Sequence, residues 1–158
     1  MSDKYEQAMR VFEDMCSLCD EMELKYERHE DKMYINFTVV GDDLPMRMFL
    51  FINPEREMIR LLSPMPFSVP EDKMAEMAMA VCAANLTLMD GSFDYILEEG
   101  NIDFRLTASY IDSIIGKELF RYMIAVSANN ADRYNDKFLM LSKGVITLEQ
   151  FVESIQKK

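Results

Sequence analysis

The amino-acid sequence predicts a single α+β domain built on an antiparallel sheet. The spacing of apolar residues changes along the chain in the order helix, four strands, helix, two strands, long helix and short helix. The 158 residues are 49% hydrophobic and 28% charged, which is typical of a globular protein with one core. We therefore expect one domain over residues 1–158, with its helices packed on the sheet.

The first predicted helix spans about Lys4 to Asp20. Asp3 with Glu6 three residues later resembles an N-terminal capping pair. The apolar residues of this helix follow the three-and-four spacing of one face: Tyr5, Ala8, Met9, Phe12, Met15, Cys16 and Cys19. An amphipathic helix of this kind packs through one side.

Two predicted strands follow, in which apolar and polar residues alternate. Their apolar positions are Met22, Leu24 and Tyr26, and then Met33, Ile35, Phe37 and Val39. This alternation is typical of strands that are buried on one face.

The third and fourth predicted strands, Met46 to Ile52 and Met58 to Leu62, are apolar on both faces. On the third strand Met48, Leu50 and Ile52 form one face, and Phe49 and Phe51 form the other. On the fourth, Met58 and Leu62 lie opposite Ile59 and Leu61. Such strands must be covered on both sides, by the protein's own helices or by a partner.

The rest of the chain predicts two more helices around a hairpin, and a short final helix. Pro70 opens a helix to about Leu88, with Met74, Met77, Ala78, Val81 and Cys82 as its apolar stripe. The hairpin strands carry Phe93, Tyr95 and Leu97, and then Ile102, Phe104, Leu106, Ala108 and Tyr110. A long helix spans about Lys117 to Lys143, and Thr147 with Gln150 caps a short helix that carries Phe151 and Ile155.

The charge of the chain excludes some classes of partner. Seventeen basic against 28 acidic residues give a formal net charge of -11, and no basic cluster is denser than Arg56 and Arg60. A nucleic-acid binder or a protein of anionic membranes needs a basic surface, so we expect neither. The acidity favours basic or hydrophobic partners. The chain has no run of about 18 apolar residues and its N-terminus is polar, so we expect a cytoplasmic protein.

No sequence motif indicates catalysis or a bound cofactor. The chain has five glycines, and it contains no Gly-x-Ser-x-Gly elbow, phosphate-binding glycine loop or His-Glu-x-x-His. His29 is the single histidine and falls in a predicted turn, without an evident nucleophile beside it. We expect no enzyme, no catalytic residue and no cofactor.

Cys16 and Cys19 form a Cys-x-x-Cys pair, a spacing that occurs in metal sites. Together with Cys82 and His29 they supply the four soft ligands that a structural zinc needs. However, both cysteines lie on the apolar stripe of the first helix, where a reduced cysteine acts as a small apolar residue. A redox motif opens a helix, whereas this pair closes one. We therefore favour core cysteines and no metal site.

Several segments of the second half resemble one protein family. They are Val69-Pro70-Glu71-Asp72-Lys73, Asn85-Leu86, Gly91-Ser92-Phe93-Asp94, Gly100-Asn101-Ile102-Asp103-Phe104-Arg105 and Ala131-Asp132-Arg133-Tyr134. In this order they resemble the YbjN family, small bacterial proteins described as sensory transduction regulators. Members of that family share the fold of type III secretion chaperones. The resemblance implies a helix–sheet–helix domain with a binding role and brings no catalytic residue or ligand with it.

These observations lead to a hypothesis of a non-enzymatic protein-interaction domain, chaperone-like or regulatory. The partner is a protein, a peptide or a second copy of the chain, bound through an apolar face of the sheet. The residues expected to bind it are Met46, Phe49, Phe51, Met58, Ile59 and Leu61. Two alternatives remain open. The protein's own helices cover both faces, or the chain is a small-molecule or metal sensor with an enclosed pocket between sheet and helices.

Overall fold

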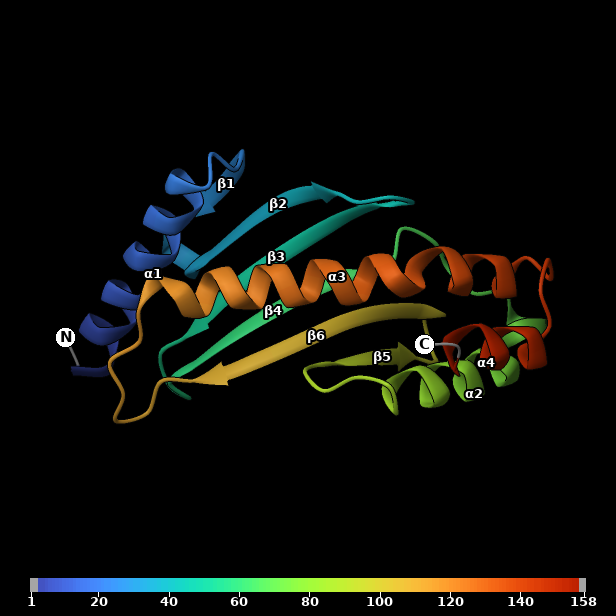
Figure 1. The fold of residues 1–158 in the computed structure, drawn as a ribbon. Helices are drawn as coiled ribbons and strands as arrows, with labels where there is room; N and C mark the ends of the chain where they lie inside the picture. Colours follow the sequence, from blue (N-terminus) through green and yellow to red (C-terminus); the bar gives the residue numbers. More distant parts are fainter. Residues whose placement is uncertain (1–2, 157–158) are drawn as a thin grey trace.

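The chain folds into an antiparallel sheet crossed on one face by a long helix (Figure 1). The computed structural model describes residues 3–156. Its helices are α1 (Asp3–Glu21), α2 (Met74–Asn85), α3 (Lys117–Ser142) and α4 (Leu148–Gln156). Its strands are β1 (Tyr26–His29), β2 (Tyr34–Val40), β3 (Pro45–Asn53), β4 (Met58–Pro64), β5 (Ser92–Ile96) and β6 (Asn101–Ser109). The predicted α+β class and the order of elements are confirmed.

The strands lie in the order β1-β2-β3-β4-β6-β5, and every neighbouring pair is antiparallel. The chain leaves the sheet after β4 to form α2, and the hairpin that follows rejoins it through its second strand, β6. In Figure 1, α1 lies at one end of α3, and α2 and α4 lie at the other.

The first strand begins later than the alternation predicted. Met22 and Leu24 close α1 instead, through hydrogen bonds from their N–H groups to the carbonyls of Leu18 (2.9 Å) and Cys19 (3.0 Å). Glu23 between them has a positive φ of 56°. This is a Schellman-type helix end, a position that glycine usually occupies. With glutamate there, the sequence carries no sign that the helix continues into this turn.

The core lies between α3 and one face of the sheet, which we call the covered face. Ile35, Leu50, Leu61 and Leu106 stand in register across four strands of this face, and all are buried. From α3, the side chains that pack inward are Phe120, Met123, Ile124, Ala131, Tyr134, Phe138 and Leu141. Near α2 and α4 the packing is aromatic, since Phe93 makes edge-on contacts with Phe104, Tyr134 and Phe138.

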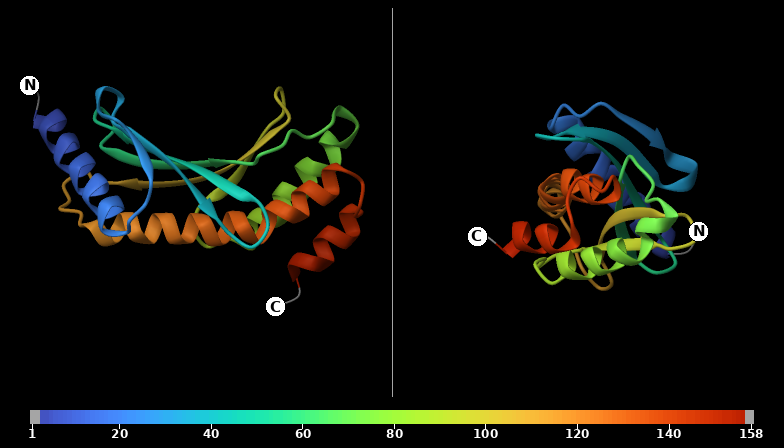
Figure 2. Two further views of the ribbon diagram at one scale, coloured as in Figure 1. Left: turned by 90° about the horizontal axis from the view of Figure 1, so that it is seen from above. Right: turned by 90° about the vertical axis from the view of Figure 1, so that its right-hand side faces the viewer.

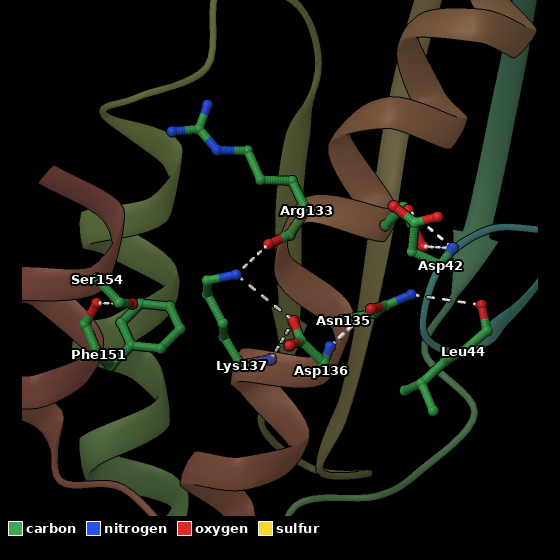
Figure 3. A network of polar contacts seen from close by, with 9 residues as sticks. Asp42, Leu44, Arg133, Asn135, Asp136, Lys137, Phe151 and Ser154 are labelled. Atoms are coloured by element: carbon green, nitrogen blue, oxygen red, sulfur yellow. Dashed lines mark hydrogen bonds and ion pairs between the residues drawn. The ribbon is translucent and has the colours of Figure 1, made fainter. Parts of the chain in front are cut away.

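The turn between β2 and β3 is attached to α3 by hydrogen bonds (Figure 3). The Asp42 N–H donates to the Asp132 carboxylate at 3.1 Å, and the Asn135 amide donates to the Leu44 carbonyl at 3.5 Å. Gly41 allows this approach, because a Cβ at that position would collide with the Asp132 carboxyl group. At its other end α3 is joined to α1 by the ion pair of Lys117 with Glu21.

Candidate partner-binding surface

The register of β3 and β4 decides which apolar residues share a face. Phe49 pairs with Leu62 and Asn53 with Met58, so odd-numbered residues of β3 stand beside even-numbered residues of β4. The face away from α3, which we call the open face, therefore carries Phe49, Phe51, Met58 and Leu62. No helix lies over its central strands in Figure 2.

The expectation that Ile59 and Leu61 share a face with Phe49 and Phe51 is wrong. Ile59 pairs with Ile52 and Leu61 with Leu50, and both are fully buried on the covered face. The four-residue turn Pro54–Glu57 sets this register, and the alternation within each strand cannot reveal it. Met46 also lies in the core, at 3% exposure. The partner-binding role of Phe49, Phe51 and Met58 stays a prediction.

The open face carries a row of aromatic rings that runs across three strands. The His29 and Tyr34 rings stack with centroids 4.2 Å apart, and Tyr34 lies 5.2 Å from Phe51. Phe51 lies 6.2 Å from Phe49, and the Arg47 guanidinium lies 5.0 Å from the centroid of the Phe49 ring. All five side chains keep part of their surface exposed. A row of half-exposed rings offers a partner large apolar contacts at a low entropic cost.

His29, which the sequence placed in a turn, is the last residue of β1 and belongs to this row. Its Nε2 lies 3.2 Å from the amide nitrogen of Asn36, which also donates to the Glu27 carboxylate at 3.0 Å. Asn36 is 7% exposed, and these contacts satisfy its amide. The network orients the histidine ring against Tyr34. It contains no nucleophile beside the imidazole.

The central strands of the open face carry basic side chains and no acidic ones. Across β2, β3 and β4, all of which the structure describes, its only charged side chains are Arg47 and Arg60. The acidic residues of this face lie on the strands to either side: Glu27 on β1, Asp94 on β5 and Asp103 on β6. The centre of the open face is therefore locally basic in a chain of net charge -11.

The acid of β5 is already engaged, and the acid of β6 is partly buried. Asp94 accepts a hydrogen bond from the Arg105 guanidinium at 2.6 Å. Burial raises the pKa of Asp103, and the nearby Asp94 and Glu99 carboxylates raise it further. Arg60 acts in the opposite direction on the same pKa.

A hollow of about 540 Å³ lies on the open face beside the β3–β4 turn. Phe51, Met58 and Leu62 give it an apolar lining, and Arg56 and Arg60 contribute guanidinium groups. No carboxylate lines it.

A second apolar surface lies on the outer side of α2 and on the segment that follows this helix, and sequence reasoning missed it. Met79, Leu86 and Met89 are 61%, 86% and 97% exposed, and Cys82 between them is also exposed. The expected core stripe was therefore wrong for Ala78 and Cys82, which face solvent, while Ala80 and Ala84 are buried. This helix is apolar on nearly every side, so its sequence predicts an exposed apolar surface but not which residues form it.

The structure does not bring together the four residues that were considered as zinc ligands. Cys16 and Cys19 are buried in α1, whereas Cys82 is exposed on α2 at the far end of the sheet (Figure 1). Within residues 3–156, no three His, Cys, Asp or Glu side chains are grouped as a metal site would need. Burial raises the pKa of Cys16 to about 11 and that of Cys19 to about 12. Both are protonated thiols packed in the core.

None of the helices in the described part of the chain combines the length and the apolar character needed to cross a bilayer.

Three solved structures have a similar fold, and two of them are protein complexes. One chain in the ExsC–ExsE complex matches 82% of this chain and 93% of its own length, at 13% identity and a TM-score of 0.56. One in the HopA1–SchA chaperone–effector complex matches 86% and 99%, at 11% identity and a TM-score of 0.57. YbjN from E. coli matches 91% and 87%, at 9% identity and a TM-score of 0.52. The fold is that of the type III secretion chaperones, as the sequence resemblance implied.

The chain belongs to the YbjN family. The family model, described as "Putative bacterial sensory transduction regulator", matches residues 12–140. It therefore covers the first half as well as the segments that carried the resemblance. The comparison with curated proteins gives no match.

Proposed function

We propose that this chain is a non-enzymatic protein-interaction domain that binds a polypeptide on the open face of its sheet. One observation carries the proposal. β3 and β4 are apolar on both faces, and the protein's own helices cover only one of them. A half-exposed aromatic row on an uncovered sheet face is a common feature of binding surfaces. The fold it shares with a chaperone of a chaperone–effector complex supports the same role.

The sensor alternative has less support. It needs an enclosed pocket between sheet and helices, and that space is filled by fully buried side chains such as Phe93, Phe104, Tyr134 and Phe138. Thermal-shift screening against metabolites and metal ions tests it. A ligand that raises the melting temperature, together with an open face that binds no polypeptide, would favour the sensor.

Photo-crosslinking in cells tests the main proposal. A benzophenone amino acid placed at Phe49 should give a discrete crosslinked product with another protein. The matched control is the same group at Ile114, an apolar residue that is fully exposed outside the open face. A Phe49 product that is absent at Ile114 supports the proposal. No product, or the same set of products at both positions, contradicts it.

A second copy of the chain is the partner that we propose for the outer side of α2. The stripe of Met79, Cys82, Leu86 and Met89 is uncharged, so two chains of net charge -11 could meet there without opposing like charges in the contact. A two-fold axis that passes beside Cys82 would bring the two Cys82 side chains together, and their small size suits close helix packing.

A further inference from the structure

We infer that the hollow beside the β3–β4 turn binds a carboxylate of an extended polypeptide, an acidic residue set among apolar ones. The inference rests on the proposed function, since it names the chemistry of the partner of the open face. It also reverses the expectation from net charge, which favoured basic partners.

The first step of the argument is the local charge. The carboxylates that make the chain acidic are absent from the open face of β2, β3 and β4, where Arg47 and Arg60 stand alone. Charges in solution are screened over about 8 Å at physiological salt, so nearby groups decide which partner is favoured in contact. A basic segment bound over this region would be repelled by the guanidinium groups of Arg47 and Arg60.

The second step is that these guanidinium groups are available. Arg28, Arg105 and Arg121 are held in ion pairs with carboxylates. In contrast, no carboxylate of residues 3–156 lies within ion-pair distance of Arg56 or Arg60. Both arginines are exposed and line the same hollow.

The third step is the placement of Arg56. Its backbone N–H donates to the Asn53 side chain at 3.0 Å, which fixes the turn from which the guanidinium extends. Arg60 comes from β4 in register with Phe51. A planar guanidinium binds a carboxylate or a phosphate group through two parallel hydrogen bonds, and the carboxylate is the one of these that an unmodified polypeptide carries.

The apolar lining determines the rest of the partner's chemistry. Phe51, Met58 and Leu62 lie directly beside the two arginines. In an extended chain, every second side chain points to the same side, about 7 Å apart. A segment whose acidic residue enters the hollow therefore presents its next inward side chains to Phe49, Phe51 and Leu62, where apolar groups fit best.

Selection from a random dodecapeptide library displayed on phage tests the inference. The targets are the chain of residues 1–158 and its Phe49→Asp, Arg60→Gln and Arg10→Gln variants. Arg10 is an exposed arginine on α1 and serves as the matched control. We expect enriched peptides that place Asp or Glu between apolar residues, and an affinity about tenfold lower for Arg60→Gln but unchanged for Arg10→Gln. A Glu→Gln change in the peptide should give a similar loss.

The outcomes separate the two proposals. Peptides that bind the wild type, fail to bind Phe49→Asp and carry Lys or Arg at the selected position would overturn the acidic preference and leave the proposed function standing. Equal binding to Arg60→Gln and wild type would do the same. A library that yields no peptide dependent on Phe49 would contradict the proposed function itself.

Discussion

Asn85 pairs with both backbone polar groups of Phe93 on β5. Its amide nitrogen donates to the Phe93 carbonyl at 2.9 Å, and its side-chain oxygen accepts from the Phe93 N–H at 2.7 Å. The side chain thus makes the two bonds that a neighbouring strand would make. Because β5 is an edge of the sheet, α2 closes that edge at this residue and opposes pairing with another chain.

Replacing Asn85 should show how much this closure contributes to the stability of the protein. Asn85→Ala leaves two backbone groups of a buried residue without their partner, and we expect a loss of about 1–3 kcal/mol in unfolding free energy. Urea denaturation followed by circular dichroism measures it. Asn85→Asp keeps an acceptor for the N–H but sets a second carboxylate oxygen against the Phe93 carbonyl, so it should lose at least as much. An unchanged midpoint for Asn85→Ala would show that the pair does not stabilise the edge.

Substitutions at the adjacent residues Phe49 and Leu50 should have opposite effects: one should affect binding and the other stability. Phe49→Asp changes the open face, so the unfolding free energy should change by less than about 1 kcal/mol while polypeptide binding is lost. Leu50→Ala removes a fully buried side chain and should cost about 2–5 kcal/mol. Thermal melts of the two variants measure the difference. Unfolding of Phe49→Asp would mean that the protein's own structure depends on the open face.

The stripe on α2 predicts a dimer that can be trapped through Cys82. Mild oxidation should give a disulfide-linked dimer in wild type, and Cys82→Ser should give none. Leu86→Asp places a charge in the proposed contact and should shift the species seen by light scattering from dimer to monomer. A wild type that is a monomer over the whole concentration range tested would contradict the second-copy proposal.

Burial of Cys16 and Cys19 predicts slow thiol reactions and a pH dependence of stability. At about pH 8, a thiol reagent should label Cys82 quickly in the native protein and label all three cysteines in denaturant. The pKa of Cys16 rises from 9.0 to about 11, so the native state holds a proton that the unfolded chain releases. Unfolding free energy should therefore fall as the pH rises from about 9 to 11. Rapid labelling of three native thiols would contradict this packing.

The sequence predicts the fold well because most of its elements have a single apolar pattern. The alternation at Phe93, Tyr95 and Ile102, and the stripe of α3, depend only on residue spacing, and both appear in the structure. The open face was harder to predict. Both faces of β3 and β4 are apolar, so which residues share a face depends on the register set by a turn. Spacing within one strand contains no information on its neighbour.

Two other differences between the predicted and the observed structure also arise because the sequence carries no signal for them. The turn at Glu23 ends α1 without the glycine that would mark it. The outer side of α2 carries the same residue types as its inner side, so the sequence could not tell core from surface there. The arginines of the open face were visible in the sequence, but their separation from the acidic residues is a product of strand order.

α3 has a consequence for how binding can be mapped. At 1.5 Å per residue its 26 residues extend for about 39 Å, and they pack against strands from both halves of the chain. Lys117 holds α1 at one end, and Asp132 and Asn135 hold the β2–β3 turn further along. The first half of the chain without this helix would lose the cover of its core. Truncated fragments should therefore unfold as a whole, and single substitutions on intact protein are the sound way to locate a binding surface.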